Sequence, residues 1–324
     1  MDYPRTNQTN CLNSDFSPVV LPARSETDRS FWDAVIKAAS AAPSADNNQP
    51  WMLKASRSAI DIYWNLDRRL PSDDGMFDLL SIGAAIENIA LQLSDLGYRN
   101  KVELSGDELS GKLQHVASIL FEKDQHVTKD DLAKFIFERH TNRYAFERAS
   151  ISADTLREIK ESAEKDNFSE LAWEAEQANI KRLSSLVALS DSLRFRYQEF
   201  HEELHRQLRL TPKHANETRD GLDYRTLGLP PGGRQLLSLL RPWKTMAFLN
   251  RFGLSKLLSI PSAHMVRQSG AIGFMFVKDR TAHSFLNGGR AMQRAWLKAA
   301  KCGLAVHPLG SLPNFLYNDS IPCE

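Results

Sequence analysis

Hydrogen-bonding side chains are concentrated in one short segment, which reads APSADNNQPW from Ala42 to Trp51. Its serine, asparagine and glutamine side chains carry both donors and acceptors. Pro43 ends the preceding alanine-rich helix because it lacks an amide donor and clashes with the turn before it. Pro50 fixes the backbone before Trp51. The segment suits a flat, polar ligand, and the alternative is a helix-stopping turn with solvated side chains.

A second cluster of polar and basic residues reads RHTNR, from Arg139 to Arg143. A guanidinium binds phosphate through two parallel hydrogen bonds and a hydroxyl adds a donor, so Arg139 and Thr141 are candidate phosphate ligands. Arg139 and Arg143 share a face if the local chain is helical. The alternative is a surface helix end with ordinary arginines.

A third motif, HEELH from His201 to His205, has the spacing of the zincin helix, which would place both histidines on one face. Its flanks are charged and polar, and residue 211 is Thr211 where a metzincin would supply a third histidine. We therefore expect no metal at this motif and a solvated amphipathic helix instead.

The composition excludes several classes of protein. A formal charge of +1 on 324 residues predicts no general attraction to nucleic acid. Cys11, Cys302 and Cys323 are scattered, which argues against a disulfide scaffold and suits a reducing cytoplasm. The polar N-terminus lacks the apolar run of a signal peptide, and we expect no membrane span.

The elements that position these motifs form two blocks. After an arm over residues 1–24, the first block should contain a helix, a strand, a second helix ending at Gly97 and a closing strand. Their expected ranges are Ser30 to Ala41, Ile60 to Tyr63, Ser81 to Leu96 and Val116 to Phe121.

The second block should begin with two helices and a long helical middle, then end with a strand and a helix that stops at Gly303. The expected ranges are Lys129 to Glu138, Ala153 to Lys165, Ile180 to Leu208, Ala271 to Val277 and Arg290 to Lys301. Because a strand, a glycine and a helix recur, with Gly83 and Gly289 expected to open the two helices, the pattern suggests an internal duplication.

The first two motifs carry a family resemblance. APSADNNQPW resembles the APSxxNxQPW signature of the nitroreductase-like flavoproteins, and RHTNR resembles their RRSxR element. The resemblance implies that Arg139 and Thr141 hold the phosphate of FMN and that Arg143 lies at the pyrimidine edge of its ring, where a cation stabilises reduced flavin. It also implies that the first loop lies against FMN through Pro43, Ser44, Asn47 and Gln49.

The segment Gly303 to Ser311, GLAVHPLGS, corresponds to the family's Pro-x-Glu-Gly turn, whose backbone amides address flavin N5. The resemblance implies the same contact from Pro308, Leu309 and Gly310. Two features depart from the family. The glutamate of the turn is missing, and the sequence shows no final strand with a basic residue for the phosphate. Either the chain is truncated before that strand, or phosphate binding rests on Arg139, Thr141 and another cation.

From Tyr224 to Lys278 the sequence has eight lysines and arginines and no acidic residue. The pattern fits a basic amphipathic surface for anionic membranes. It equally fits a lid over an anionic cofactor. The Acg-like branch of the family has a lid in this part of the chain, and the resemblance therefore favours a lid in which Trp243 and Phe248 exclude solvent.

The resemblance as a whole implies an α+β nitroreductase-like fold made of two degenerate halves that form a pseudo-dimer around one FMN site. The expected units are 1–24, 25–128 and 129–324, with the lid at about 195–265. The implied activity is NAD(P)H-dependent reduction of a small-molecule electron acceptor, such as a nitro or quinone compound, by a cytoplasmic monomer or homodimer. The alternative is a protein that binds or sequesters FMN without turnover.

Overall fold

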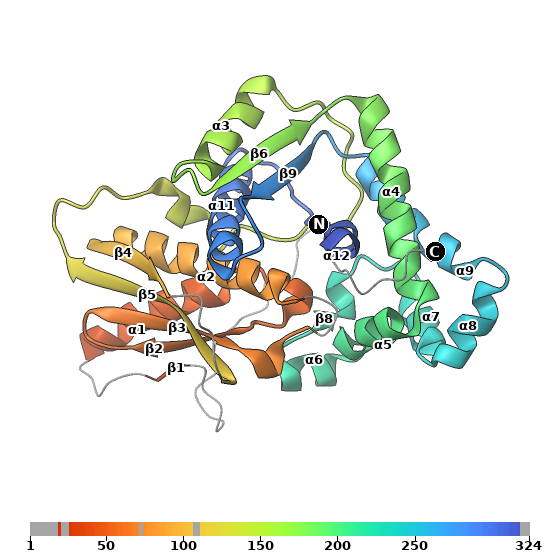
Figure 1. Cartoon of the computed structure of the whole chain (residues 1–324), viewed down its shortest axis with the longest axis horizontal. Coiled ribbons are helices and arrows are strands. Elements are labelled where there is room, and N and C mark those ends of the chain that lie inside the picture. Colours follow the sequence, from red (N-terminus) through yellow and green to blue (C-terminus); the bar gives the residue numbers. More distant parts are fainter. Residues whose placement is uncertain (1–18, 21–25, 71–73, 106–110, 318–324) are drawn as a thin grey trace.

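The computed structural model describes residues 19–20, 26–70, 74–105 and 111–317, with side chains from residue 29 onward in those ranges. It is a mixed α and β structure in which the sheets are largely antiparallel. Figure 1 shows a five-stranded sheet with its helices at one end, a two-stranded sheet beside it, and a group of helices at the other end.

The five-stranded sheet has the order β1-β2-β3-β5-β4, and only the β1–β2 pair is parallel. Its strands are β1 (Val19–Val20), β2 (Trp51–Ala55), β3 (Ala59–Asn65), β4 (Tyr98–Leu104) and β5 (Leu113–Lys123). Alternate residues of β3 are buried, as expected of a strand with one face on the core. The strands expected at 60–63 and 116–121 are confirmed. β1 lies within the expected arm, whose other residues are outside the described ones.

The core of this half lies between the sheet and two helices, α1 (Glu26–Ser40) and α2 (Met76–Asp95). α2 begins before the expected Ser81 and ends as expected, with Gly97 at φ +84° just beyond it. By length and composition α2 is apolar enough to cross a membrane, although no segment of that kind was expected. However, 89% of its apolar window is buried inside the protein, which identifies α2 as a core helix.

The second half repeats the order helix, two antiparallel strands, helix. It consists of α3 (Ala153–Ala163), β6 (Ser169–Glu174), β9 (Ile272–Val277) and α11 (Ala282–Lys301). The helix expected from Ala153 and the strand expected before Lys278 are confirmed. α11 begins well before the expected Arg290, because Thr281 caps its N-terminus by accepting from the amide of Ser284.

α2 and α11 pack at their glycines through contacts that occur in matched pairs. A Cβ added to Gly83 would lie 2.0 Å from the carbonyl oxygen of Leu286, and one added to Gly289 would lie 2.0 Å from that of Leu80. Because both glycines lie within their helices, the expectation that they open them is wrong. The glycines are needed for close approach of the two helix backbones.

The polar contacts between the same two helices are also paired. Arg294 donates to Glu87 over 2.9 Å, and Gln293 donates to Asn88 over 2.7 Å. Glu87 and Gln293 stand at matching positions of α2 and α11, as do Asn88 and Arg294. Such reciprocal contacts are what a two-fold relation between two helices produces.

A long helical segment separates β6 from β9. It contains α4 (Gln177–Arg196), α5 (Gln198–Gln207), α6 (Pro212–Thr218), α7 (Gly233–Leu240), α8 (Trp243–Asn250), α9 (Leu254–Leu258) and α10 (Ile260–Arg267), with short strands β7 (Leu208–Arg209) and β8 (Leu222–Asp223). The helical middle expected over 180–208 is confirmed, but it is divided into α4 and α5 because Tyr197 adopts extended backbone angles.

The helix expected from Lys129 to Glu138 is also wrong. Only a short 3-10 helix, η3 (Asp131–Phe135), forms there, and Asp130 caps it through the amide of Leu132. The same carboxylate accepts from Arg294, which ties the start of η3 to α11. The remaining short helices are η1 (Ala45–Asn47), η2 (Leu66–Arg68), η4 (Tyr224–Thr226) and α12 (Ser311–Tyr317).

Candidate functional site

The loop between α1 and β2 has an unusual backbone. Asp46, Asn47 and Gln49 all have positive φ angles, of 47°, 58° and 48°. Side chains other than glycine seldom adopt this region, although asparagine and aspartate tolerate it better than glutamine. The amide of Gln49 donates to the hydroxyl of Ser44 over 3.1 Å and closes the turn. Clustered left-handed residues of this kind are typical of functional loops.

Buried hydrogen bonds fix the loop onto α2. The side-chain amide of Asn48 donates to Asp78 over 2.6 Å, and Trp64 donates to the other oxygen of the same carboxylate over 2.9 Å. Arg68 donates to the carbonyl of Asn48 over 3.0 Å. Burial raises the pKa of Asp78 to about 6, although both hydrogen bonds act to lower it. These contacts hold Asn48 in place and thereby fix the backbone of its neighbours Asn47 and Gln49.

Sequence reasoning missed Asn48 and Asp78. The family signature leaves the position of Asn48 unspecified, yet it is the one asparagine of the loop that is buried. The available signal was Asp78 itself, an acidic residue in the first turn of a largely apolar helix.

Arg139 joins the loop to the second half of the chain. One terminal nitrogen donates to the carbonyl of Ala41 over 3.2 Å, and the guanidinium carbon lies 4.5 Å from the ring centroid of Trp296. Its Nε and Nη1 atoms are buried and have no hydrogen-bond partner among the described residues. Burial lowers the pKa of Arg139 to about 10. A buried cation with two open donors is a binding group for an anion.

Residues 141–143 are not helical, so Arg139 and Arg143 do not share a helix face. Thr141 instead forms a parallel β-bridge with Val306. The amide of Asn142 donates to the carbonyl of Val306 over 2.9 Å, and His307 Nδ1 lies 2.6 Å from the carbonyl oxygen of Asn142. These bonds bring the segment that precedes Pro308 against the RHTNR cluster.

Arg143 lies between the loop and a covering segment. Burial lowers the pKa of Arg143, and the nearby charge of Asp46 opposes that shift. Arg143 reaches the carbonyl of Thr226 over 3.5 Å, and Gln49 donates to the carbonyl of Arg219 over 2.9 Å. The segment 219–228 therefore contacts both the loop and the RHTNR cluster.

Gly228, at φ +63°, completes that contact. A Cβ at this position would lie 2.8 Å from the carbonyl oxygen of Arg143. The expected lid aromatics lie elsewhere. The ring of Trp243 packs 5.5 Å from that of His201, and Phe248 is exposed. The covering segment is thus 219–228 rather than the helices that follow it.

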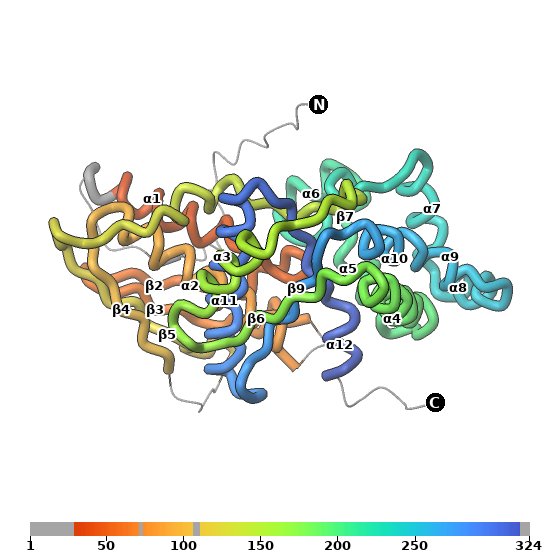
Figure 2. Tube along the Cα trace, turned by 90° about the horizontal axis from the view of Figure 1, so that it is seen from above, coloured from red at the N-terminus to blue at the C-terminus, as the bar shows by residue number. Residues whose placement is uncertain are grey.

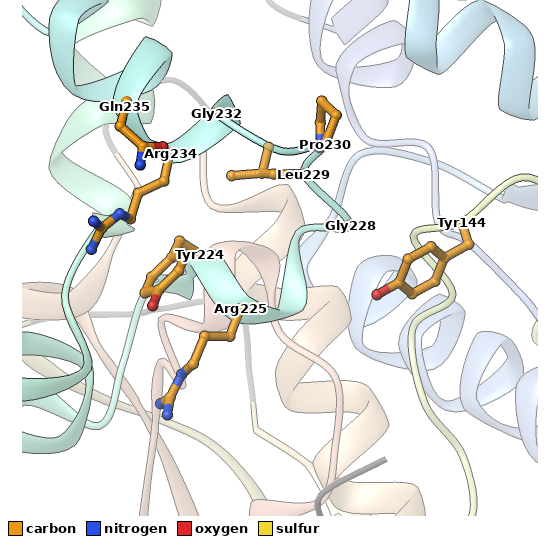
Figure 3. Close-up of a pocket in the computed structure, with 9 residues that line it drawn as sticks. All are labelled: Tyr144, Tyr224, Arg225, Gly228, Leu229, Pro230, Gly232, Arg234 and Gln235. Atoms are coloured by element: carbon orange, nitrogen blue, oxygen red, sulfur yellow. The ribbon is translucent and has the colours of Figure 1, made fainter. Parts of the chain in front are cut away.

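A cavity of about 310 Å³ borders the covering segment (Figure 3). Tyr144 enters it from a separate stretch of chain, while its other lining residues, Tyr224 among them, come from η4, the Pro/Gly turn and the start of α7. Arg234 lies 5.3 Å from the ring centroid of Tyr224. The cavity is lined by aromatic and basic side chains next to Arg143.

The structure thus brings together the three segments that the sequence singled out. Half-buried positions of these segments are Pro43, Ser44, Gln49, Arg139, Thr141, Arg143, Leu309 and Gly310. Asn47 and Pro308 are exposed. Gly310 lies near Phe77 of α2, where an added Cβ would be 3.5 Å from the ring.

The HEELH helix differs from the expected solvated one. His201 and His205 are buried, with ring centroids 4.2 Å apart. His201 Nε2 lies 3.3 Å from the carbonyl oxygen of Arg241, and His205 Nε2 lies 3.3 Å from that of Leu237. In the described part of the chain, no group of three or more histidine, cysteine or acidic side chains is arranged to hold a metal. The histidines fix α5 to the C-terminal end of α7.

Comparison with known proteins finds a distant relative. No family model matches the sequence. The chain is 26% identical over 291 residues to a protein of Mycobacterium tuberculosis (strain CDC 1551 / Oshkosh) described as "Uncharacterized protein MT1398". The match covers 88% of this chain but only 39% of that relative, so the chain spans about two fifths of its length.

Proposed function

We propose that the site between the Ala42–Trp51 loop and the RHTNR cluster binds FMN, and that the protein is an NAD(P)H-dependent oxidoreductase of nitroreductase type. The observation that carries the proposal is Arg139. Its guanidinium is buried against Trp296 with two donor nitrogens unpaired among the described residues and no carboxylate beside it. An anionic ligand would supply the missing acceptors.

The residues around Arg139 suit this cofactor. Thr141 would add a hydroxyl donor to the phosphate, and Arg143 would present a cation to the pyrimidine edge of the ring. Pro43, Ser44, Asn47 and Gln49 would lie along the flavin, held in place by Asn48 and Asp78. The backbone amides of Leu309 and Gly310, in the turn that begins at Pro308, would contribute hydrogen-bond donors. The chemistry that such a cofactor would supply is hydride transfer from a nicotinamide, followed by reduction of a small acceptor of the nitro or quinone class.

The paired contacts of α2 and α11 support a nitroreductase-like pseudo-dimer within one chain. Gly83 and Gly289 make reciprocal backbone contacts, and the Glu87 and Asn88 contacts with α11 are reciprocal too. In such an arrangement the first half supplies the loop and the second half supplies RHTNR. The chain would then build one complete site as a monomer in the cytoplasm, and a homodimer would not be needed for it.

The covering segment favours a second candidate function, FMN sequestration without turnover. Gln49 and Arg143 hold residues 219–228 across the site through carbonyl oxygens of Arg219 and Thr226. A segment held in this way would retain FMN and would also obstruct the nicotinamide that a reductase must admit.

One experiment separates these functions. The purified protein is loaded with FMN, its visible spectrum is recorded, and NADPH is added without oxygen. Bleaching of the flavin band supports the reductase, and a yellow protein that does not bleach supports sequestration. A protein that takes up no FMN contradicts both, and one that carries stoichiometric zinc would instead direct attention to His201 and His205.

The loop and cluster are tested by replacing Asn47 and Arg139 together, N47A with R139M. We expect loss of FMN retention, because the double variant removes a ring contact and the phosphate cation. A fully yellow double variant would mean that this loop is not the flavin site.

A further inference from the structure

The helices that follow the covering segment carry an exposed surface that is both apolar and basic, here called the basic apolar face. Its large hydrophobic side chains are Leu236, Leu239, Phe248, Phe252, Leu257 and Ile260. Its exposed cations are Arg234, Arg241, Lys244, Arg251 and Lys256. Figures 1 and 2 show α8 and α9 at the end of the molecule away from the five-stranded sheet.

Helical spacing gathers these residues on outer faces. In α8, the exposed Lys244 and Phe248 are four residues apart, and Arg251 and Phe252 continue the same stripe, while Met246 is fully buried. The exposed Leu257 of α9 and Ile260, at the start of α10, are three residues apart. Each helix therefore buries one side in the protein and presents apolar and basic residues together on the other.

Phe248 and Phe252 are the exposed aromatic pair of the face. They are 56% and 78% exposed, and their rings lie 5.6 Å apart in an edge-to-face contact. Isolated exposed hydrophobic residues are common on proteins, but a contiguous group of large ones marks an interaction site.

The charge of the surrounding chain identifies the occupant. From 224 to 278 the chain has eight lysines and arginines and no acidic residue. A second copy of this face would bring cations against cations, so self-association is unfavourable. An anionic lipid bilayer instead offers phosphates to the cations and hydrocarbon to the phenylalanines.

We propose that the basic apolar face docks on anionic membrane surfaces. Phe248 and Phe252 enter the boundary between headgroups and acyl chains, and Lys244, Arg251 and Lys256 contact lipid phosphates. The site around Arg139 takes no part in this contact, so the proposal does not depend on flavin binding.

The test is co-sedimentation of the full chain with vesicles of phosphatidylcholine alone or mixed with phosphatidylglycerol. We expect binding only to the anionic vesicles, and weaker binding as salt is raised. F248S/F252S should weaken binding about tenfold or more, because two large apolar contacts are lost. K244E/R251E should weaken it at least as much.

The matched control is L120S/F276S, which removes two exposed hydrophobic residues from β5 and β9. Its binding should equal that of the unmodified chain. Circular dichroism and thermal melts would establish that each variant is folded. Equal binding to neutral vesicles, no binding at all, or unchanged binding by F248S/F252S would overturn the proposal. So would a dimer in sedimentation velocity that F248S/F252S converts to monomer.

Discussion

Arg139 donates a hydrogen bond to the carbonyl of Ala41, which lies immediately before the polar loop, although the two residues are in different halves of the chain. Its Nε and Nη1 atoms are buried without a hydrogen-bond partner among the described residues. The chain therefore keeps a desolvated cation at the junction of its two halves, an arrangement that costs stability and favours an anion.

Replacing Arg139 by methionine should separate stability from binding. The pKa of Arg139 is lowered to about 10, so the charged form is less favourable in the folded chain than in the unfolded one. R139M should therefore stabilise the ligand-free protein, by on the order of 1–2 kcal/mol after loss of the contact with Trp296. Differential scanning calorimetry measures this.

The same variant should bind FMN at least about tenfold more weakly, because a charge-assisted contact to phosphate is removed. Fluorescence titration of FMN provides the measurement, with R157M at an exposed position of α3 as the charge-matched control. A destabilised R139M with unchanged FMN affinity would show that Arg139 is structural.

Asp78 should give the protein a distinctive dependence of stability on pH. Its pKa is raised from 3.8 to about 6 by burial. Between these values the folded chain binds a proton that the unfolded chain releases, so stability falls as pH rises through this window. The loss should be about 2–3 kcal/mol above about pH 6.

Urea unfolding from pH 4 to pH 7 measures this slope. D78N cannot ionise and should lack Asp78's contribution to it, while D67N, at an exposed turn, should retain it. If D78N and the unmodified chain show parallel curves, Asp78 does not titrate in this range.

Gly83 and Gly289 should resist substitution for one shared reason. An added Cβ at either site would lie 2.0 Å from a carbonyl oxygen of the facing helix, and backbone at a helix crossing has little room to move. G83A and G289A should each destabilise the protein by about 2 kcal/mol or more, despite the gain in helix propensity.

Gly288 provides the matched control in the same helix. An added Cβ there would meet side chains, the nearest being Val277 at 2.6 Å, which can turn aside. G288A should therefore cost less than either G83A or G289A in chemical denaturation. Equal losses in all three variants would mean that the α2–α11 crossing is not the cause.

The sequence predicts the helices and strands better than it predicts the buried contacts that hold the candidate site in place. Alternation and apolar runs located β3, β5 and α3, because those patterns follow from which face meets the core. The residue types alone suggested that a helix begins at Gly289. In the structure α11 begins at Ala282, and Gly289 lies inside it, where it packs against Leu80. The break between α4 and α5 at Tyr197 contains no proline or glycine, so the local sequence did not predict it.

The candidate site shows the same division. The RHTNR and APSADNNQPW motifs were visible as clusters of polar types, and the structure brings them together. The buried support from Asn48 to Asp78 was not visible, since it depends on a distance of 2.6 Å between segments separated by β2 and β3. The burial of His201 and His205 was also missed, because it depends on contacts with Leu237, Arg241 and Trp243, which lie more than thirty residues further along the chain.

The covering segment should loosen when Gly228 gains a side chain. Gly228 has φ +63°, and a Cβ there would lie 2.8 Å from the carbonyl oxygen of Arg143. G228A should push residues 219–228 away from Arg143. If FMN binds as proposed, its dissociation should be faster by about tenfold, with protease cleavage of the segment also accelerated.

Gly232 is the control, since it has φ +81° but nothing within 4 Å of an added Cβ. Both variants share the backbone strain, and only G228A adds the clash. Stopped-flow release of FMN therefore isolates the contact with Arg143, and equal rates for G228A and G232A would show that this contact does not hold the segment closed.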